Sequence, residues 1–489
     1  KTRNLVLAGN FNLTNVNELF DRLVAFGQFP VETSDTITML EKIGHFLDEE
    51  NEELYRRYKY EGYTKQEATE QIANALDMRN VLTRASSDWD GGYVITGLLG
   101  HGDAFVMRDP NGIRPAFYYV DDEIVVAASE RPVIQTTFNV KAENIKEIKP
   151  GHVLIIKNHN TIEELEVLPP APRKSCSFER IYFSRGTDID IYKERKKLGA
   201  LITPKILQEI NHDLKNTVFS YIPNTAAVAY QGMVEEVNKF CNQYKTDQIL
   251  ELGDQISKEK LDEIMMFSPR IETVAVKDMK LRTFITQDNQ RDDLVGHVYD
   301  ITYGSIREGK DKLVIIDDSI VRGTTLKQSI ISIIDRLGPT DIIVVSSAPQ
   351  IRYPDCYGID MARLGDFIAF KAAIELLKDT KQESVINQVY QKCKAQQGLP
   401  KEEVVNHVKE IYKPFTAQQI SDKIAELVSP KNVKAKVKVL YQTIENLHAA
   451  IPHEVGDWYF TGNYPTPGGN KVVNTSFINY IEGKTARAY

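Results

Sequence analysis

Cysteine is scarce in this 489-residue chain, and long hydrophobic runs are missing. The four cysteines stand far apart, and no two of them have the close spacing of a zinc or iron–sulfur motif. No stretch reaches the roughly 18 consecutive apolar residues of a membrane-spanning helix. No basic leader with an apolar run precedes the first strand-like segment, residues 5–8. We therefore expect a cytoplasmic protein with reduced thiols and no membrane span.

A large excess of one sign of charge is also missing. The chain has 60 Lys and Arg against 68 Asp and Glu, a net charge of −8 and a pI of about 5.7. This balance excludes a protein whose main partner is nucleic acid or an anionic membrane. Any phosphate group must be held locally, by loops and helix ends. The length suits two to three domains with real cores.

The pattern of elements changes along the chain. Short apolar runs separated by Gly, Asp and Pro, such as residues 91–99, predict an antiparallel sheet in the first 170 residues. Helical spacing over residues 36–85 predicts helices packed on that sheet. A Pro-rich, charged segment, residues 168–174, predicts a linker. We place a domain boundary there, with domains at 1–170 and 171–375 and a C-terminal extension at 376–489.

Beyond the linker the pattern predicts a βαβ unit. Apolar strands are expected at residues 218–222, 313–316 and 342–346, with a helix at 326–337. Parallel α/β sheets carry such buried strands. Residues 374–448 have helical periodicity, and those after Pro465 read as turns.

The most informative segment is residues 313–325, LVIIDDSIVRGTT. An apolar strand ends in Asp317 and Asp318, and a short loop then leads to Gly323, Thr324 and Thr325 at the start of a helix. A helix N-terminus presents unpaired N–H groups and partial positive charge, so it stabilises a phosphate. The carboxylates accept hydrogen bonds from sugar hydroxyls. The segment predicts a site for a phosphorylated sugar at the carboxyl end of the sheet.

This pattern resembles the phosphoribosyl-pyrophosphate motif of type I phosphoribosyltransferases. Further segments resemble the glutamine phosphoribosylpyrophosphate amidotransferases in particular. These segments are residues 108–115, 182–185, 351–354 and 357–360. The resemblance implies α/β and α+β architecture: a partial N-terminal Ntn-hydrolase-type αββα sandwich, then a phosphoribosyltransferase domain with a parallel sheet, then C-terminal helices.

The same resemblance implies an enzyme of de novo purine synthesis. In the family, a glutaminase frees ammonia from glutamine, and the transferase places it on C1 of phosphoribosyl pyrophosphate to form phosphoribosylamine. The family uses Mg²⁺, is inhibited by purine nucleotides and forms homo-oligomers, with a tetramer expected here.

The resemblance also assigns roles to individual residues. Lys277, just before a closing loop at residues 281–285, and Arg282, within that loop, would neutralise the departing pyrophosphate. The two aspartates would also hold the magnesium ion. The expected contacts to the substrate come from a pyrophosphate loop and from the motif itself: Pro223, Asn224, Thr225, Asp317, Asp318, Ser319, Arg322, Gly323, Thr324 and Thr325.

The glutaminase half matches the family less well. Asn10 resembles the Asn of the oxyanion hole, and Asp35 resembles the Asp that holds the glutamine amino group. Phe11 stands where the family has Gly, and the catalytic Cys of the family has no counterpart before Cys176. We expect the chain to start partway through this domain. A β-turn at residues 10–12 and an N-cap at Asp35 remain alternatives.

Other departures from the family concern the iron–sulfur cluster that some relatives carry and two further segments of the chain. Gly456 and Tyr459 occupy positions that are cysteines in cluster-bearing relatives, so no iron–sulfur cluster is expected, and Cys356 is expected in the core. Residues 231–269 look like an insertion, and residues 296–303 replace a basic stretch. Two alternatives remain. One is a salvage or orotate-type phosphoribosyltransferase with an unrelated N-terminal domain. The other is a non-catalytic sensor of nucleotides or phosphoribosyl groups, which Phe11, Ala226 and the altered stretch at residues 296–303 favour.

Overall fold

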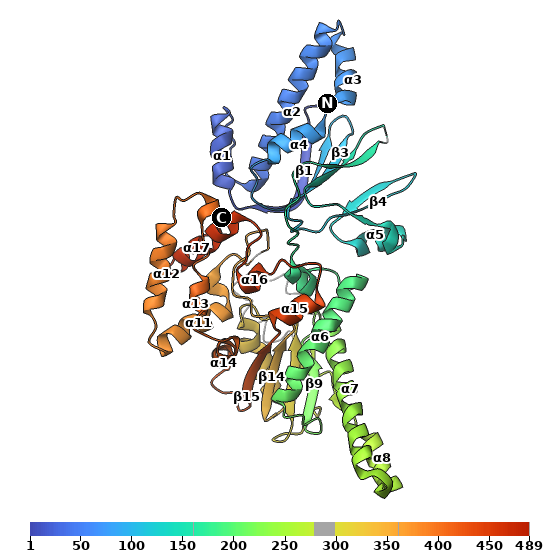
Figure 1. The fold of residues 1–489 in the computed structure, drawn as a ribbon, viewed down its shortest axis with the longest axis vertical. Coiled ribbons are helices and arrows are strands. Elements are labelled where there is room, and N and C mark those ends of the chain that lie inside the picture. The colour runs from blue at the N-terminus through green and yellow to red at the C-terminus, as the bar shows by residue number, and fades with distance from the viewer. Residues whose placement is uncertain (160, 278–298, 360, 489) are drawn as a thin grey trace.

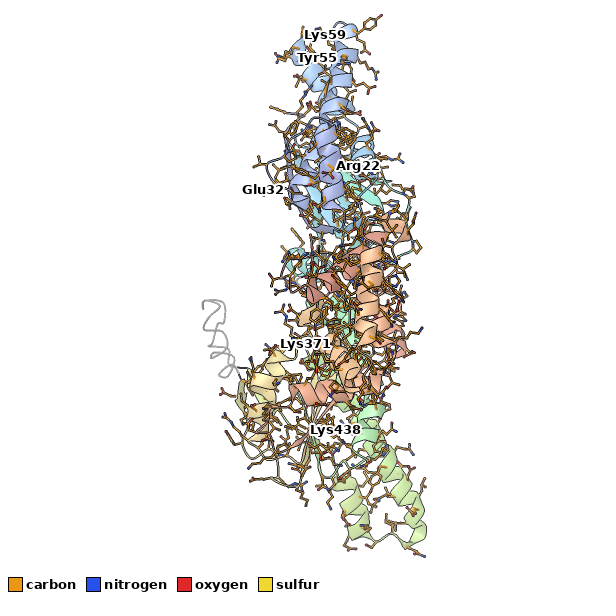
Figure 2. The ribbon with its side chains drawn as sticks, turned by 90° about the vertical axis from the view of Figure 1, so that its left-hand side faces the viewer. Arg22, Glu32, Tyr55, Lys59, Lys371 and Lys438 are labelled. Atoms are coloured by element: carbon orange, nitrogen blue, oxygen red, sulfur yellow. The ribbon has the colours of Figure 1, made fainter. Side chains whose placement is uncertain are left out.

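The computed structural model describes residues 1–159, 161–277, 299–359 and 361–488. Two sheets stand one above the other in an elongated molecule (Figure 1). Figure 2 shows α2 and α3 at one end, near Tyr55 and Lys59, and α7 and α8 at the other. In the described part of the chain, no helix is long and apolar enough to cross a membrane.

The N-terminal sheet is antiparallel and has the strand order β1-β2-β3-β7-β8. Helices α2, α3 and α4 pack on one face of it around buried Leu13, Ile43 and Ile95. A smaller sheet, β5-β4-β6, lies beside it. The elements are β1 (Leu5–Leu13), α1 (Val16–Ala25), α2 (Asp35–Tyr60), α3 (Lys65–Ala75), α4 (Met78–Ser86), β2 (Gly91–Leu99), β3 (Ala104–Arg108), β4 (Phe117–Val120), β5 (Val125–Ala128), α5 (Arg131–Phe138), β6 (Lys146–Glu147), β7 (His152–Ile156) and β8 (Ile162–Glu166).

Local sequence explains where these helices begin. The Ser34 hydroxyl accepts a hydrogen bond from the Ile37 N–H and caps α2. Thr64 and Glu67 form a reciprocal capping box at the start of α3. Asp35 is therefore the first helical residue of α2 rather than its N-cap. Residues 10–12 lie inside β1, so the β-turn alternative for them is wrong.

The second sheet is parallel throughout, with the order β10-β9-β13-β14-β15. α6 and α7 cover one face, and α10, α11 and α14 cover the other. The elements are α6 (Ile189–Glu209), β9 (Thr217–Tyr221), α7 (Ala227–Leu252), α8 (Lys258–Met266), β10 (Arg270–Ile271), β11 (Ala275–Lys277), β12 (Tyr299–Ile301), β13 (Lys312–Asp317), α10 (Ile331–Asp335), β14 (Asp341–Ser346), α11 (Ile368–Asp379), α12 (Ser384–Ala395), α13 (Lys409–Tyr412), α14 (Ala417–Val428), β15 (Lys436–Tyr441), α15 (Ile444–Ala450), α16 (Trp458–Thr461) and α17 (Pro467–Ile481).

Two expectations for the C-terminal region are wrong. Residues 436–441 are not helical; they form β15, which extends the parallel sheet as an edge strand beside β14. Residues after Pro465 are not mainly turns, because α17 begins at Pro467 and runs to Ile481. Proline suits the first turn of a helix, where its missing N–H has no partner to lose. The expected insertion forms most of α7 and all of α8, which project from the sheet (Figure 1).

A buried turn after β3 connects the two halves of the molecule. The Asp109 carboxylate accepts the N–H groups of Asn111 and Ile113, each at 3.0 Å. Arg114 is buried, and its guanidinium donates to the Tyr357 carbonyl in the second half. Because Arg114 is buried and donates to this carbonyl, the turn joins the N-terminal half to the second half.

Candidate active site

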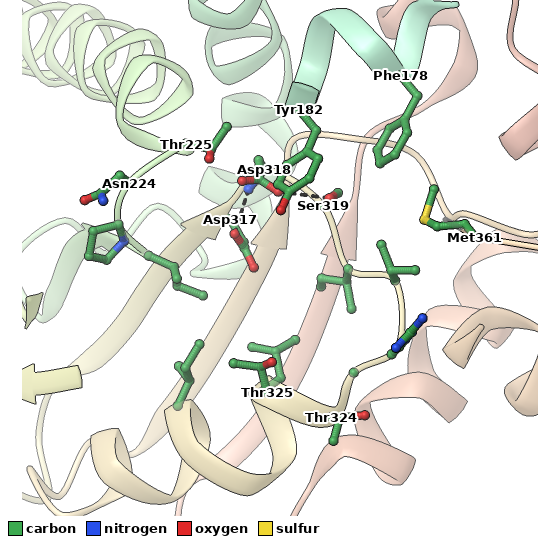
Figure 3. Close-up of a pocket in the computed structure, with 18 of the residues that line it drawn as sticks. Phe178, Tyr182, Asn224, Thr225, Asp317, Asp318, Ser319, Thr324, Thr325 and Met361 are labelled. Atoms are coloured by element: carbon green, nitrogen blue, oxygen red, sulfur yellow. Dashed lines mark hydrogen bonds between the residues drawn. The ribbon is translucent and has the colours of Figure 1, made fainter. Parts of the chain in front are cut away.

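A pocket of about 510 Å³ opens at the carboxyl end of the parallel sheet. Figure 3 shows Asp317, Asp318 and Ser319 at its centre, Asn224 and Thr225 on one side, and Thr324 and Thr325 on another. All ten residues expected to contact the sugar pyrophosphate line this one pocket: Pro223, Asn224, Thr225, Asp317, Asp318, Ser319, Arg322, Gly323, Thr324 and Thr325. Topology brings them together, since β9 and β13 are neighbours and their ends meet at one edge.

The two carboxylates at the end of β13 are partly shielded from solvent. Asp318 is 9% exposed, and Asp317 is half-buried. The Ser319 hydroxyl donates to Asp318 Oδ1 at 2.9 Å, and the Asp318 N–H donates to Asp317 Oδ1 at 2.8 Å. Burial raises the pKa of Asp318 to about 6, and burial together with the neighbouring Asp318 charge raises the pKa of Asp317 well above its usual range. Both carboxyls therefore hold their protons to a higher pH than an exposed aspartate does.

The loop after β13 is exposed and leads into a helix. Arg322, Thr324 and Thr325 are exposed, and a π-helical turn over Leu326–Ile330 continues into α10. Gly323 has a φ of +71°, and a Cβ there would come within 3.0 Å of Val428 and 3.2 Å of Ile368. Glycine lets the loop take this conformation without strain. The arrangement suits a phosphate at the helix start.

The loop after β9 forms the opposite wall. Pro223, Asn224 and Thr225 follow the strand directly and precede α7. The Thr225 hydroxyl hydrogen-bonds to Asp318 and lowers the pKa of that carboxyl, against the larger effect of burial. The loop and the carboxylate pair therefore form one connected polar surface.

An aromatic and apolar wall completes the pocket, and the sequence analysis did not assign it to the site. Phe178 and Tyr182 stack with ring centroids 6.1 Å apart. Tyr299 lies beside the carboxylates, and burial together with their charge raises its pKa to about 12. One sequence signal could have revealed this wall: the resemblance to the family at residues 182–185, which places an aromatic pair next to the domain boundary. The wall consists of Phe178, Tyr182, Phe183, Tyr299, Ile359 and Met361.

The two cations expected to neutralise pyrophosphate cannot be placed. Lys277 ends β11, opposite Tyr299 of β12, but its side chain lies outside the described residues. Arg282 and the rest of the expected closing loop, residues 281–285, also lie outside them.

The residues expected for glutamine are not brought together. Asn10 pairs with Val94 in the N-terminal sheet and lines a cavity of about 310 Å³ beside Arg114 and Glu179. Asp35 lines a separate cavity of about 460 Å³ with Lys471. The Asp35 carboxylate accepts the Thr36 N–H at 2.7 Å.

The four thiols have no activated environment. Each is buried, and burial raises the pKa of Cys176, Cys241, Cys356 and Cys393. A raised pKa leaves little thiolate at neutral pH, which makes a thiol a weak nucleophile. The expectation that Cys356 is a small core residue is confirmed.

The carboxylate pair offers oxygen ligands of the kind that divalent cations take in proteins. Among the described residues, no group of three or more Asp, Glu, His or Cys side chains could hold a metal by itself. Mg²⁺ commonly takes one or two carboxylates and completes its shell with water and phosphate oxygens. Asp317 and Asp318 offer such oxygens at the pocket floor.

Comparison with known proteins agrees with this arrangement. Residues 59–169 match the model for class-II glutamine amidotransferases. Amidophosphoribosyltransferases of Bacillus subtilis and Escherichia coli are 25% and 26% identical, over 76% of this chain and 65% and 66% of their own length. That of Lachancea kluyveri is 29% identical, over 61% of this chain and 54% of its own. The chain thus spans about two thirds or less of these relatives.

A solved structure gives the fold. Glutamine phosphoribosylpyrophosphate amidotransferase from B. subtilis, complexed with ADP and GMP, has a TM-score of 0.60 and 22% identity. The match covers 94% of this chain and 77% of the other. The expected fold class is confirmed. By sequence the chain is related to the amidophosphoribosyltransferases, carries a class-II glutamine amidotransferase domain, and shares the fold of this family.

Proposed function

We propose that this chain is an amidophosphoribosyltransferase, a pentosyltransferase of EC class 2.4.2.14, which forms 5-phosphoribosylamine in the first step of purine nucleotide synthesis. One observation carries the proposal: a single pocket collects a carboxylate pair, an exposed phosphate loop at a helix start and a second loop at the neighbouring strand end. The names of the relatives agree with it. A cytoplasmic location and a homo-oligomeric state remain predictions.

The substrate would lie across the pocket with each group against its chemical complement. The 5′-phosphate would accept hydrogen bonds from the loop over Arg322, Gly323, Thr324 and Thr325, and Ser319 would add a hydroxyl. Asp317 and Asp318 would accept hydrogen bonds from the ribose hydroxyls. Pro223, Asn224 and Thr225 would contact the pyrophosphate at the other wall.

In the transfer step, the nitrogen of ammonia forms a bond to C1 of the ribose while the bond from C1 to the pyrophosphate oxygen breaks. The ammonium nitrogen then loses one proton to solvent. Positive charge develops on the sugar and negative charge on pyrophosphate. The carboxylates stabilise the sugar, and Lys277 and Arg282 would stabilise the leaving group. When bound, Mg²⁺ would neutralise pyrophosphate charge, with Asp317 and Asp318 in its shell.

The nitrogen is proposed to come from glutamine in the whole protein. The assignment of Asn10 and Asp35 to one glutamine site stays a prediction, because the two residues line different cavities. Ammonia from solvent should serve the transferase pocket directly. Because the B. subtilis structure is complexed with ADP and GMP, purine nucleotides are proposed as inhibitors of this chain.

The test measures pyrophosphate release from phosphoribosyl pyrophosphate with ammonium chloride and Mg²⁺, and glutamate release from glutamine. We expect turnover with ammonium. The chain's thiols lie in buried, deactivating sites, so we expect no glutamate from these 489 residues. The double variant Asp317→Asn, Asp318→Asn should lose transfer, whereas Asp122→Asn, at an exposed turn, should keep it. Equal turnover in both variants would contradict the assigned roles.

A second candidate is a sensor that binds nucleotides or phosphoribosyl groups without turnover. The separation of Asn10 and Asp35 into different cavities favours it. Phosphoribosyl pyrophosphate binding without pyrophosphate release from either nitrogen source would identify the sensor.

A further inference from the structure

The outer half of α2 presents a charged helix face that the proposed chemistry does not use. This helix has 26 residues, which at the usual rise per residue is a length of about 39 Å. Figure 1 shows α2 at one end of the molecule, and Figure 2 shows Tyr55 and Lys59 near its tip. One side of α2 packs in the N-terminal core through Ile43, Leu47 and Leu54. The other side is left to solvent.

The solvent-facing side carries charges of opposite sign at its two ends. A groove of about 830 Å³ runs along it, with lining residues at helical spacing: Gln28 from the loop after α1, then Glu41, Gly44, His45, Asp48, Glu49, Glu52, Glu53 and Arg56. Five of these side chains are carboxylates. Lys59 and Tyr60 continue the same face beyond Arg56, because residues three and four apart on a helix are neighbours. We call this face, from Glu41 to Tyr60, the α2 stripe; it is acidic first and basic at its tip.

Contacts within the chain neutralise only part of this charge. Three arginines pair with carboxylates of the groove: Arg3 with Asp48 and Glu52, Arg56 with Glu52, and Arg84 with Glu49. Over the described residues, Glu41 and Glu53 have no ion-pair partner, and neither has Lys59. The Lys59 ammonium lies over the Tyr55 ring, 5.9 Å from its centroid. The α2 stripe therefore keeps charge of both signs for contacts outside its own chain.

Aromatic surface is exposed at both ends of the α2 stripe. Tyr60 is 95% exposed at the tip. At the acidic end, the Phe26 ring stacks on the His45 ring with centroids 4.9 Å apart, and Phe26 itself is 50% exposed. Gly44 leaves room beside them, since a Cβ at this position would meet no atom within 4 Å. The groove can therefore accept an aromatic side chain from a second molecule.

We propose that the α2 stripe is an interface between two copies of this chain, which pack antiparallel about a two-fold axis near Glu52. Antiparallel packing places the basic tip of each copy against the acidic groove of the other, whereas parallel packing would place like charges together. One two-fold axis makes both contacts at once, as in an isologous dimer. The inference is independent of the proposed chemistry, because no residue of the sugar-phosphate pocket takes part in it.

The spacing along α2 supports this register. Arg56 lies four residues after Glu52, and Asp48 lies four residues before it, so an axis at Glu52 brings Arg56 of one copy beside Asp48 of the other. Tyr60 and Gly44 are each eight residues from Glu52, so the exposed ring meets the open part of the groove. Each Glu52 carboxylate at the axis is already paired with two arginines of its own copy, at 3.2 Å each, which limits the repulsion between the two carboxylates.

The experiment measures self-association by sedimentation velocity, on the unmodified 489-residue chain and on charge-reversed variants. The chain concentration covers about two orders of magnitude, so that mass action separates monomer from dimer, at low and at high salt. The tip variant is Arg56→Glu with Lys59→Glu, and the groove variant is Asp48→Lys with Glu49→Lys. The combined variant carries all four substitutions.

A matched control makes the same change in net charge as the tip variant at the far end of the molecule. This control is Lys258→Glu with Lys260→Glu, and both lysines are exposed on α8. Far-UV circular dichroism and urea unfolding confirm that each variant is folded. Tyr60→Ser probes the same interface without any change of charge.

We expect the unmodified chain to associate, and to associate less at high salt. The tip variant and the groove variant should each weaken the association about tenfold or more, because like charges then meet at both contacts. An equimolar mixture of the two variants should regain the association of the unmodified chain, and so should the combined variant, since opposite charges meet again. The control should resemble the unmodified chain, and Tyr60→Ser should associate more weakly.

An unmodified chain that stays monomeric over the whole concentration range would overturn the proposal. A tip variant that associates as strongly as the control would also overturn it, because the chain would then associate through another surface. Weaker association of both variants without recovery in their mixture would contradict the antiparallel pairing of charges. Should a charge-reversed variant not fold, Tyr60→Ser decides, and association equal to that of the unmodified chain would overturn the interface.

Discussion

Replacing Asp318 by Asn should make the ligand-free chain more stable. Burial raises the pKa of Asp318 to about 6, from an ordinary value of 3.8. Between these values the folded state binds more protons than the unfolded state, so the stability of the unmodified chain falls as pH rises through this window and levels off above it. The ionised carboxylate thus costs stability at neutral pH.

The size of the gain in stability follows from the shift in the pKa of Asp318. About two pKa units correspond to about 3 kcal/mol at pH 8, and Asn removes this cost without changing the side-chain shape. The Asn carbonyl can still accept the hydrogen bond from the Ser319 hydroxyl. Because the neighbouring Asp317 also titrates, we expect a net gain of about 1–3 kcal/mol.

Urea unfolding of Asp318→Asn and of the unmodified chain, from pH 4 to pH 8.5, measures this difference. The gain should be full above about pH 6.5 and disappear near pH 4, where Asp318 is protonated. Asp122→Asn, at an exposed position, serves as the control and should show no gain. A variant that is less stable at pH 8, or a difference independent of pH, would refute the reasoning.

Three further predictions concern the same pocket and its frame. Because burial raises the pKa of both carboxyls, to about 6 for Asp318, the Mg²⁺ complex of phosphoribosyl pyrophosphate should displace protons at pH 6, which calorimetry in buffers of different ionisation enthalpy would detect; no buffer dependence would contradict this. AMP or GMP should weaken the apparent affinity for the sugar pyrophosphate in competition titrations, since both present a ribose 5-phosphate; independent binding would argue against a shared pocket. A Cβ at Gly232 would lie 1.8 Å from the Lys196 carbonyl oxygen, so Gly232→Ala should destabilise the chain by about 3 kcal/mol. As the control, Gly44→Ala places a Cβ that meets no atom within 4 Å, so its stability in urea should equal or exceed that of the unmodified chain. If Gly232→Ala were as stable as Gly44→Ala, the helices α6 and α7 would be able to move apart, and the prediction would be wrong.

The centre of the pocket could be predicted because its signals are local. A continuous apolar run ending in two carboxylates and followed by Gly-Thr-Thr specifies a strand, a loop and a helix start within thirteen residues, 313–325. The strand β13 and the pocket lining agree with that expectation. The burial of the carboxylates could not be predicted in this way, because Tyr182 and Tyr299 line the same pocket from distant segments.

The local sequence of β15 and of α17 favoured a different structure from the one observed. In β15, Lys436 and Lys438 alternate with Val437 and Val439, as suits an edge strand, but the charge-rich surroundings favoured a helix. At the start of α17, Pro467, Gly468 and Gly469 read as a turn. A Cβ at Gly468 would clash with Thr14 and Asp90, so this glycine serves the contact of α17 with the N-terminal half.

A crystal structure of the chain with Mg²⁺ and phosphoribosyl pyrophosphate, or with ribose 5-phosphate, tests the central proposal most directly. The 5′-phosphate should occupy the loop over Arg322, Gly323, Thr324 and Thr325, with the ribose hydroxyls at Asp317 and Asp318 and the pyrophosphate toward Asn224 and Thr225. Density for the ligand outside this pocket, or an empty pocket at saturating ligand, would contradict the assignment of the site.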